Sequence, residues 1–303
     1  MGEVVVRVGP KTGPVGTVLL HGAAGSWTTW TPLLRAASGE GAPLPNIVAV
    51  DLPGWGESPA PAGGIDIAPL TDAVRQVAEA LGYERWVVVG HSLGGAIALD
   101  VAARFPDRTD AVLLVSPSGG AVLDAVRRPI HGGAGLPWFA GMLLAMRVLA
   151  ALGPVAGPLL RGLRRLGALR WLSSPLFAVP ARVDGSVSAA LADEIRPASF
   201  VAAARAAARY DESVWRGIRC PVRSVRGARD VFVGPNDGVE LAALIPDFQE
   251  TVVDEAGHFA AVERPERVRE MLGAFGMPAA ERVSDGRRDG QVIVGARRVG
   301  DEA

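Results

Sequence analysis

The sequence has little cysteine: Cys220 is the single one in 303 residues. One cysteine cannot form an intramolecular disulfide. The opening MGEVVVRVGPK also lacks the basic and long apolar regions of a secretory signal peptide. Both absences favour a reducing compartment, and we expect the protein to be cytoplasmic.

The sequence also lacks an excess of charge of either sign. It has 31 Lys+Arg against 32 Asp+Glu and a formal net charge of −1. A chain without a net positive field has no general attraction for polyanions, so nucleic acid is not expected as a partner. The most apolar stretch, Leu136 to Leu160, is interrupted by Arg147 and three prolines, and we therefore expect no integral membrane segment.

Sequence motifs for metal or phosphate binding are missing as well. The chain contains no HExxH, no CxxC and no glycine-rich phosphate loop. We therefore expect neither a metal nor an organic cofactor.

Short β-branched runs alternate with helical patterns along much of the chain. Between two of these runs, residues 70–81 repeat apolar side chains at helical spacing, and Gly82 follows where a helix cap would lie. Runs that are apolar on both faces are typical of buried parallel strands, so the pattern predicts an α/β fold with a doubly wound, mostly parallel sheet. The predicted strands are 17–20, 47–50, 86–90, 111–115, 222–225 and 250–253.

The alternation stops between residues 121 and 210, where no strand-like run is present. We expect a helical insertion at 121–210, an α/β core formed by 1–120 and 211–276, and a disordered tail at 277–303, in which only QVIVG resembles a strand. Residues 121–200 hold nine arginines and four acidic residues. Two interpretations stay open: a solvated face whose arginine stems cover apolar surface, or a surface for an anionic substrate or for lipid.

The stretch GHSLG, residues 90–94, places a hydroxyl between a valine strand and a helical pattern. A tight turn from strand to helix exposes such a hydroxyl, and it requires glycines two positions to either side, here Gly90 and Gly94. The alternative is that Ser92 merely caps the helix.

Further landmarks occur in a fixed order: HGAAGS (21–26), DLPGWGES (51–58), GHSLGG (90–95), GARD (227–230) and AGHF (256–259). Together they resemble the α/β-hydrolase superfamily from about Gly16 to Phe275, in its form as a serine hydrolase with a helical cap. The resemblance implies Ser92 as nucleophile, His258 as general base and Asp230 as the acid that orients it. It also implies an oxyanion hole formed by the backbone N–H groups of Ala23 and Leu93.

Other histidines and acids fit these roles less well. His21 belongs to the expected oxyanion loop, His91 should point away from the serine, and His131 lies in the insertion. Asp254 is the second choice for the acid, Asp237 is expected near a helix start, and Asp51 is expected to stabilise a turn. We expect the insertion to roof a mainly apolar pocket, lined by Trp27, His91, Trp138, Phe139 and Phe259.

These residues predict a serine hydrolase that cleaves a carboxylic ester, lactone or thioester through an acyl-enzyme, on a small and apolar acyl substrate. Serine at position 92 disfavours the dehalogenase and epoxide hydrolase branches, which carry aspartate there. Phe259 weakens, without excluding, the C–C bond hydrolases, which commonly have tryptophan after the histidine. A cofactor-free haloperoxidase (perhydrolase) stays open, as does a non-catalytic small-molecule receptor.

Overall fold

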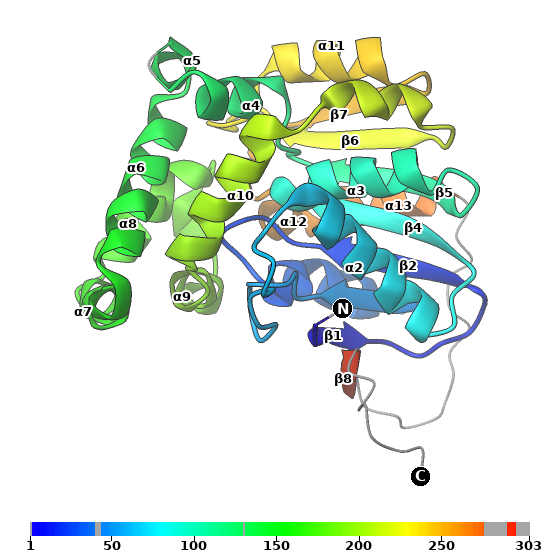
Figure 1. Cartoon of the computed structure of the whole chain (residues 1–303), viewed down its shortest axis with the longest axis horizontal. Helices are drawn as coiled ribbons and strands as arrows, with labels where there is room; N and C mark the ends of the chain where they lie inside the picture. The colour runs from blue at the N-terminus through cyan, green and yellow to red at the C-terminus, as the bar shows by residue number, and fades with distance from the viewer. Residues whose placement is uncertain (1, 40–43, 130, 276–289, 295–303) are drawn as a thin grey trace.

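The computed structural model describes residues 2–39, 44–129, 131–275 and 290–294, and their strands form one eight-stranded sheet (Figure 1). The strand order is β7-β6-β5-β4-β2-β3-β1-β8. Strands β2 to β7 are parallel, whereas β1 pairs antiparallel with β3 and β8. The predicted α/β fold with a mostly parallel sheet is confirmed. The strands are β1 Val4–Val8, β2 Val15–Leu20, β3 Ile47–Val50, β4 Arg85–His91, β5 Thr109–Val115, β6 Val222–Gly227, β7 Phe248–Val253 and β8 Gly290–Val294.

Each of the six predicted strands lies within an observed one, because apolar residues on both faces of the central strands are covered by helices. One face packs against α2, α3 and α11, and the other against α1, α12 and α13. The helices of the core are η1 Trp27–Trp30, α1 Thr31–Gly39, α2 Ile67–Ala80, α3 Leu93–Arg104, η5 Glu212–Gly217, α11 Pro235–Leu244, α12 Ala260–Glu263 and α13 Pro265–Gly273.

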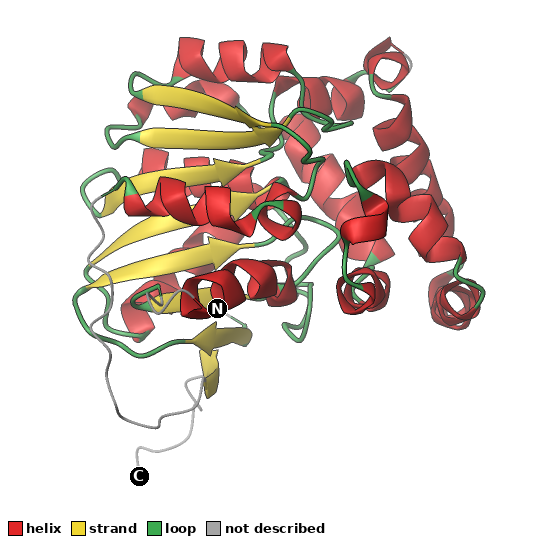
Figure 2. Ribbon diagram, turned by 180° about the vertical axis from the view of Figure 1, so that it is seen from behind, coloured by secondary structure: helices red, strands yellow, loops and turns green. Residues whose placement is uncertain are grey.

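Within the described residues, the segment between β5 and β6 contains helices joined by short loops and no strand. Figure 2 shows its helices beyond the carboxyl ends of the parallel strands. A separate apolar cluster joins α4, α6 and α10 to Phe232 and Val233 of the core. The helices between β5 and β6 are α4 Gly120–Arg127, α5 His131–Gly135, α6 Pro137–Ala151, η2 Gly153–Val155, α7 Ala156–Arg165, α8 Ala168–Ser173, η3 Ser174–Leu176, η4 Pro180–Arg182, α9 Gly185–Asp193 and α10 Pro197–Arg209.

The prediction of a disordered tail is wrong for Gly290–Val294, which form β8 at the edge of the sheet. Five residues of β8 pair with β1, from Val4 opposite Val294 to Val8 opposite Gly290. A β-branched run can complete the backbone hydrogen bonds of an exposed edge strand, and β1 offers such an edge. The rest of the predicted tail, 277–289 and 295–303, lies outside the described residues.

No single helix in the described ranges is long and apolar enough to cross a membrane. Pro137–Ala151 and Gly153–Arg165 reach that length together, but the pair is bent by 114°.

Candidate active site

Ser92 lies on a sharp turn between β4 and α3. Its backbone has φ 52° and ψ −117°, a left-handed conformation that costs free energy in a residue with a Cβ atom. A Cβ atom at Gly90 would lie 2.3 Å from the carbonyl oxygen of Gly94, and one at Gly94 would lie 2.3 Å from that of Leu20. The two glycines therefore allow strand and helix to meet closely enough to form the turn.

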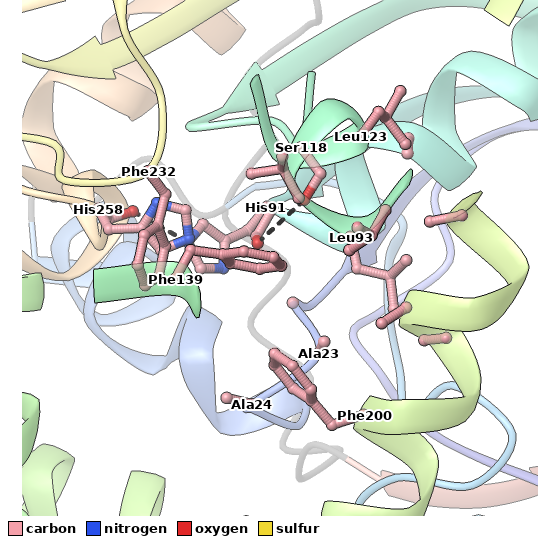
Figure 3. Close-up of a pocket in the computed structure, with 18 of the residues that line it drawn as sticks. Ala23, Ala24, His91, Leu93, Ser118, Leu123, Phe139, Phe200, Phe232 and His258 are labelled. Carbon is pink, nitrogen blue, oxygen red and sulfur yellow. Dashed lines mark hydrogen bonds between the residues drawn. The ribbon is translucent and has the colours of Figure 1, made fainter. Parts of the chain in front are cut away.

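The Ser92 hydroxyl does not cap the helix that it precedes, since its side chain makes no capping hydrogen bond. Its Oγ lies 3.4 Å from the Oγ of Ser118, at a cavity that both residues line (Figure 3). The turn is fixed by the backbone, because Ser92 N–H donates to Val115 and Ser118 N–H donates to Ser92. This arrangement leaves the hydroxyl available to a molecule in the cavity.

His258 lies at the same cavity, on the loop that follows β7, and it contacts Asp230, which is on the loop that follows β6. His258 Nδ1 is 3.1 Å from each carboxylate oxygen of Asp230. A carboxylate accepts hydrogen bonds, so Nδ1 carries the proton and Nε2 is left as the basic nitrogen. The two side chains are 5% and 0% exposed, which shields the pair from water.

The Asp230 carboxylate is held in its charged form. Burial opposes ionisation, but the interaction with the charged form of His258 and the hydrogen bonds to the carboxylate together lower the pKa of Asp230 below its usual value. The backbone N–H groups of Phe232 and Val233 also donate to Asp230 Oδ1, at 2.8 and 3.1 Å. A charged and fixed carboxylate at this position can orient the imidazole.

Ser92 and His258 line one cavity but make no hydrogen bond to each other within the described chain. The hydroxyl of Ser92 instead contacts the hydroxyl of Ser118, which follows β5. Hydrogen bonds between a nucleophile and its base are often long in enzymes without bound substrate.

Hydrogen bonds of the His21 and Asp51 side chains hold the loop after β2 in place. His21 is fully buried; its Nδ1–H donates to Gly22, and its Nε2 accepts from Leu52 N–H at 3.0 Å. Asp51 accepts from the N–H groups of Trp27 and Glu57, at 2.9 and 3.0 Å. Both residues therefore hold loops in place, as their positions in the sequence suggest.

Ala23 and Leu93 present backbone groups at the cavity wall beside Ser92. Ala23 is positioned by its carbonyl, which accepts from the indole N–H of Trp55 at 2.8 Å. Leu93 is the first residue of α3, where backbone N–H groups have no partner within the helix. Neither N–H donates to an acceptor in the described ranges, so both are available to an oxygen in the cavity.

His91 lies between the serine turn and the histidine loop. Burial and the neighbouring His258 lower the pKa of His91 to about 3, so the ring is neutral at pH 7. Its Nε2–H donates to the carbonyl of His258 at 3.0 Å. This bond fixes the backbone of the histidine loop relative to the turn that carries Ser92.

The cavity is lined mainly by apolar side chains from the core and from the insertion (Figure 3). Three of the five predicted pocket residues, His91, Phe139 and Phe259, contribute to it. Sequence reasoning missed most of the lining, because residues on the insertion helices carry no motif. The missed residues include Ser118, Val122, Val126, Phe200, Ala204 and Phe232.

Two predicted pocket residues lie elsewhere. Trp27 packs against the core cluster of α1, α12 and α13, with the Arg7 guanidinium 5.1 Å from its ring centre. Trp138 is 57% exposed at the start of α6, although its neighbour Phe139 is buried at the cavity. One residue along a helix turns the side chain by about 100°, which places the two aromatic rings on different faces.

The other candidate acids do not reach His258. Asp254 is exposed after β7. Asp237 is buried in the first turn of α11, where its carboxylate accepts from Ala121 N–H and Gly234 N–H. His131 begins α5, on the exposed side of the insertion. Within the described ranges, no group of three or more His, Cys, Asp or Glu side chains is arranged to hold a metal ion.

Comparison with known proteins identifies the class that this fold and site define. A model of the alpha/beta hydrolase family matches residues 17–271. The chain therefore belongs to the alpha/beta hydrolase family and is an enzyme of that class.

Three proteins that match this chain individually share less than 30% sequence identity with it. The uncharacterized protein Rv2715 of Mycobacterium tuberculosis (strain ATCC 25618 / H37Rv) is 27% identical over 272 residues, which cover 85% of this chain and 74% of the relative. RutD of Escherichia coli O7:K1 (strain IAI39 / ExPEC), which is named for a carbamate hydrolase activity, is 28% identical over 84% of this chain and 88% of its own. The solved structure of Est816, described as an N-acyl homoserine lactone degrading enzyme, matches with a TM-score of 0.67 and 23% identity, over 90% of this chain and 97% of that chain.

Proposed function

We propose that the protein hydrolyses a carboxylic ester, lactone or thioester through an acyl-enzyme formed on Ser92. The observation that carries the proposal is that a half-buried serine with a strained backbone and the His258 of a buried His258–Asp230 pair line the same apolar cavity. A serine hydroxyl is a weak nucleophile near neutral pH and requires such a base.

In the first step, Ser92 Oγ leaves Ser118 and donates its proton to Nε2 of His258. Oγ forms a bond to the carbonyl carbon as the carbonyl π electrons move to the oxygen. The Ser92–carbon bond stays when the tetrahedral intermediate collapses, and the leaving group departs with the proton from Nε2. A water molecule then attacks the acyl-enzyme and gives its proton to Nε2, which returns it to Ser92.

The negative oxygen of the tetrahedral intermediate requires hydrogen-bond donors that are already in place. We assign this role to the backbone N–H groups of Ala23 and Leu93, which are open to the cavity. Removing one such donor in comparable sites lowers kcat by about 100-fold or more. Asp230 keeps the proton of His258 on Nδ1 and stabilises the imidazolium ion.

The cavity supports a substrate with an apolar acyl group. Phe139, Phe200 and Phe232 surround it, and the polar side chains at the wall are few. Burial of each additional methylene group contributes about 0.8 kcal/mol, so acyl chains that reach these rings should bind more tightly. The helical insertion acts in this proposal as the cap that sets acyl specificity.

The test is the hydrolysis of p-nitrophenyl esters from acetate to decanoate at neutral pH, by the wild type and by Ser92→Ala. We expect turnover by the wild type, a preference for medium chains, and a fall of at least 10³-fold in Ser92→Ala. Ser186→Ala is the matched control, since Ser186 is an exposed serine on α9.

Failure of both proteins on every ester would contradict hydrolysis of simple acyl compounds. A fluorophosphonate that labels Ser92 in that case would favour cleavage of a C–C bond in a vinylogous diketone. Peroxide-dependent halogenation by the wild type that exceeds ester turnover would favour the perhydrolase alternative instead.

A further inference from the structure

One face of α6 is exposed and, apart from Arg147 at its edge, carries apolar residues. Trp138, Leu144 and Val148 are 57%, 61% and 53% exposed, and the same stripe continues through Leu152 to Val155 in η2. The opposite face of the helix is buried through Phe139, Leu143 and Met146. Apolar helix surface is normally covered by a neighbouring element, and no described element covers this stripe.

The apolar surface continues on the next two helices. Leu166, at the end of α7, is 83% exposed, and Trp171 of α8 is 76% exposed. Leu172 is also exposed. Figures 1 and 2 place α6, α7 and α8 at the end of the molecule away from the sheet. We call this surface, formed by the exposed residues of α6 to α8, the outer face.

The charge of the outer face is of one sign. Between Asp124 and Asp184 the sequence has eight arginines and no aspartate or glutamate, although the whole chain has a net charge of −1. Four of these arginines are exposed and form no ion pair with any described residue: Arg147, Arg161, Arg165 and Arg170. By contrast, Arg164 pairs with Asp193 of α9.

We propose that the outer face binds the surface of an anionic lipid bilayer. Apolar side chains with two tryptophans would enter the boundary between headgroups and acyl chains, and the four free guanidinium groups would contact lipid phosphates. Each basic residue near an anionic surface strengthens binding about fivefold. This charge pattern favours lipid over a second copy of the chain, whose same face would bring the arginines together.

The geometry of the helices indicates a position in the plane of the interface. The bend of 114° between α6 and the helical segment Gly153–Arg165 prevents the pair from forming one straight span. Both can instead lie against the bilayer with their exposed sides. The proposal does not depend on the chemistry at Ser92.

The test is co-sedimentation of the full chain with vesicles, using the Ser92→Ala variant so that the lipids stay intact whatever the enzyme cleaves. We expect binding to vesicles of equal parts phosphatidylglycerol and phosphatidylcholine, and at least tenfold weaker binding to phosphatidylcholine alone. The difference should shrink as the salt concentration rises from about 0.1 M to about 1 M.

Two paired variants in the same background separate the apolar contribution from the charged one. Leu144→Ser with Val148→Ser should weaken binding to both kinds of vesicle at least tenfold. Arg161→Glu with Arg165→Glu should remove the preference for phosphatidylglycerol. The matched control is Val239→Ser with Arg219→Glu, since both residues are exposed away from the outer face, on α11 and before β6. Circular dichroism checks that each variant is folded.

The proposal is overturned if the protein does not sediment with phosphatidylglycerol vesicles, or if the outer-face variants bind as tightly as the control. A dimer in sedimentation velocity that Leu144→Ser with Val148→Ser dissociates, without vesicle binding, would assign the outer face to a second copy of the chain.

Discussion

The side chains of Ser92 and His258 each contact a partner residue, Ser118 and Asp230 respectively, that restricts their orientation. The Ser92 hydroxyl is 3.4 Å from that of Ser118, and His258 Nδ1 is 3.1 Å from both oxygens of Asp230. The first contact is weak and can be exchanged at small cost, whereas the second is charged and buried. In the proposed mechanism the base is therefore oriented before substrate binds, and the Ser92 hydroxyl exchanges Ser118 for His258.

Asp230→Asn should lower kcat by about 10³- to 10⁴-fold with little change in KM. An amide in place of the carboxylate no longer stabilises the imidazolium ion, and its NH₂ group favours the wrong tautomer of His258. Asp254→Asn, which alters the second candidate acid, should leave kcat within about twofold because Asp254 is exposed. Steady-state kinetics on one activated ester measure both variants. Equal losses in the two would remove Asp230 from the proposed role.

Glu194 provides a pH-dependent contact between the insertion and the loop after β2. It is 8% exposed and accepts hydrogen bonds from Ser26 and Thr28, while its Oε2 has no partner among described residues. Burial is the main cause of a raised pKa at this carboxyl. The folded state therefore binds the proton more tightly than the unfolded state, and stability falls as the pH rises through the folded pKa.

Glu194→Gln should accordingly raise Tm at pH 8, because the amide keeps a hydrogen-bond acceptor without a buried charge. The gain over the wild type should shrink as the pH falls and level off below about 4, where the wild-type carboxyl becomes protonated in the unfolded state as well. Thermal unfolding across this pH range measures the difference. Glu84→Gln, at an exposed position, serves as control and should show no such trend. A lower Tm for Glu194→Gln at pH 8 would contradict the argument.

At the level of elements, the sequence predicts best those strands, helices and turns that are set by local residue patterns. The order of strands along the chain, the helix at 67–80 and the turn at Ser92 follow from local patterns of valine, leucine and glycine. Strand β1 was not predicted, although Val4–Val8 is a β-branched run, and β8 was assigned to a disordered tail. β1 pairs with β3 and with β8, and β8 pairs with β1 from the other end of the chain; no local pattern specifies such long-range pairing.

The turn between β4 and α3 should not accept a side chain at Gly90. In Gly90→Ala the new Cβ would lie 2.3 Å from the Gly94 carbonyl oxygen, so α3 would have to shift and carry Leu93 with it. We expect loss of at least 10²-fold in kcat/KM together with a lower Tm.

Gly141→Ala on α6 is the matched control, since nothing lies within 4 Å of the added Cβ. Alanine there should raise stability by up to about 1 kcal/mol, as expected within an exposed helix. Urea unfolding measures both variants, and a Gly90→Ala protein with unchanged midpoint and activity would show that the turn is not so constrained.

At the scale of the whole molecule, contacts between the insertion and the core hold the insertion over the cavity. Arg127 of α4 forms an ion pair with Glu212 and thereby joins the beginning of the insertion to the segment that follows it. Ser199 of α10 donates to the Gly54 carbonyl at 2.7 Å. Such long-range contacts fix which faces of α6 and α10 line the cavity. The sequence pattern does not specify these contacts, so it predicted both Phe139 and Trp138 at the cavity, where only Phe139 lies.

The small side chains of α10 keep the space between the insertion and the core open, so enlarging one should shorten the acyl chain that fits. Ala204 lines the cavity. In Ala204→Leu we expect at least a tenfold fall in kcat/KM for the decanoate ester and a change of less than about threefold for acetate, since a short acyl group does not reach α10. The control is Ala198→Leu, at an exposed position of the same helix, which should leave the chain-length profile unchanged. Equal losses on acetate and decanoate in Ala204→Leu would mean that the substitution disturbs Ser92 and its neighbours, and that α10 does not form the wall of the acyl site.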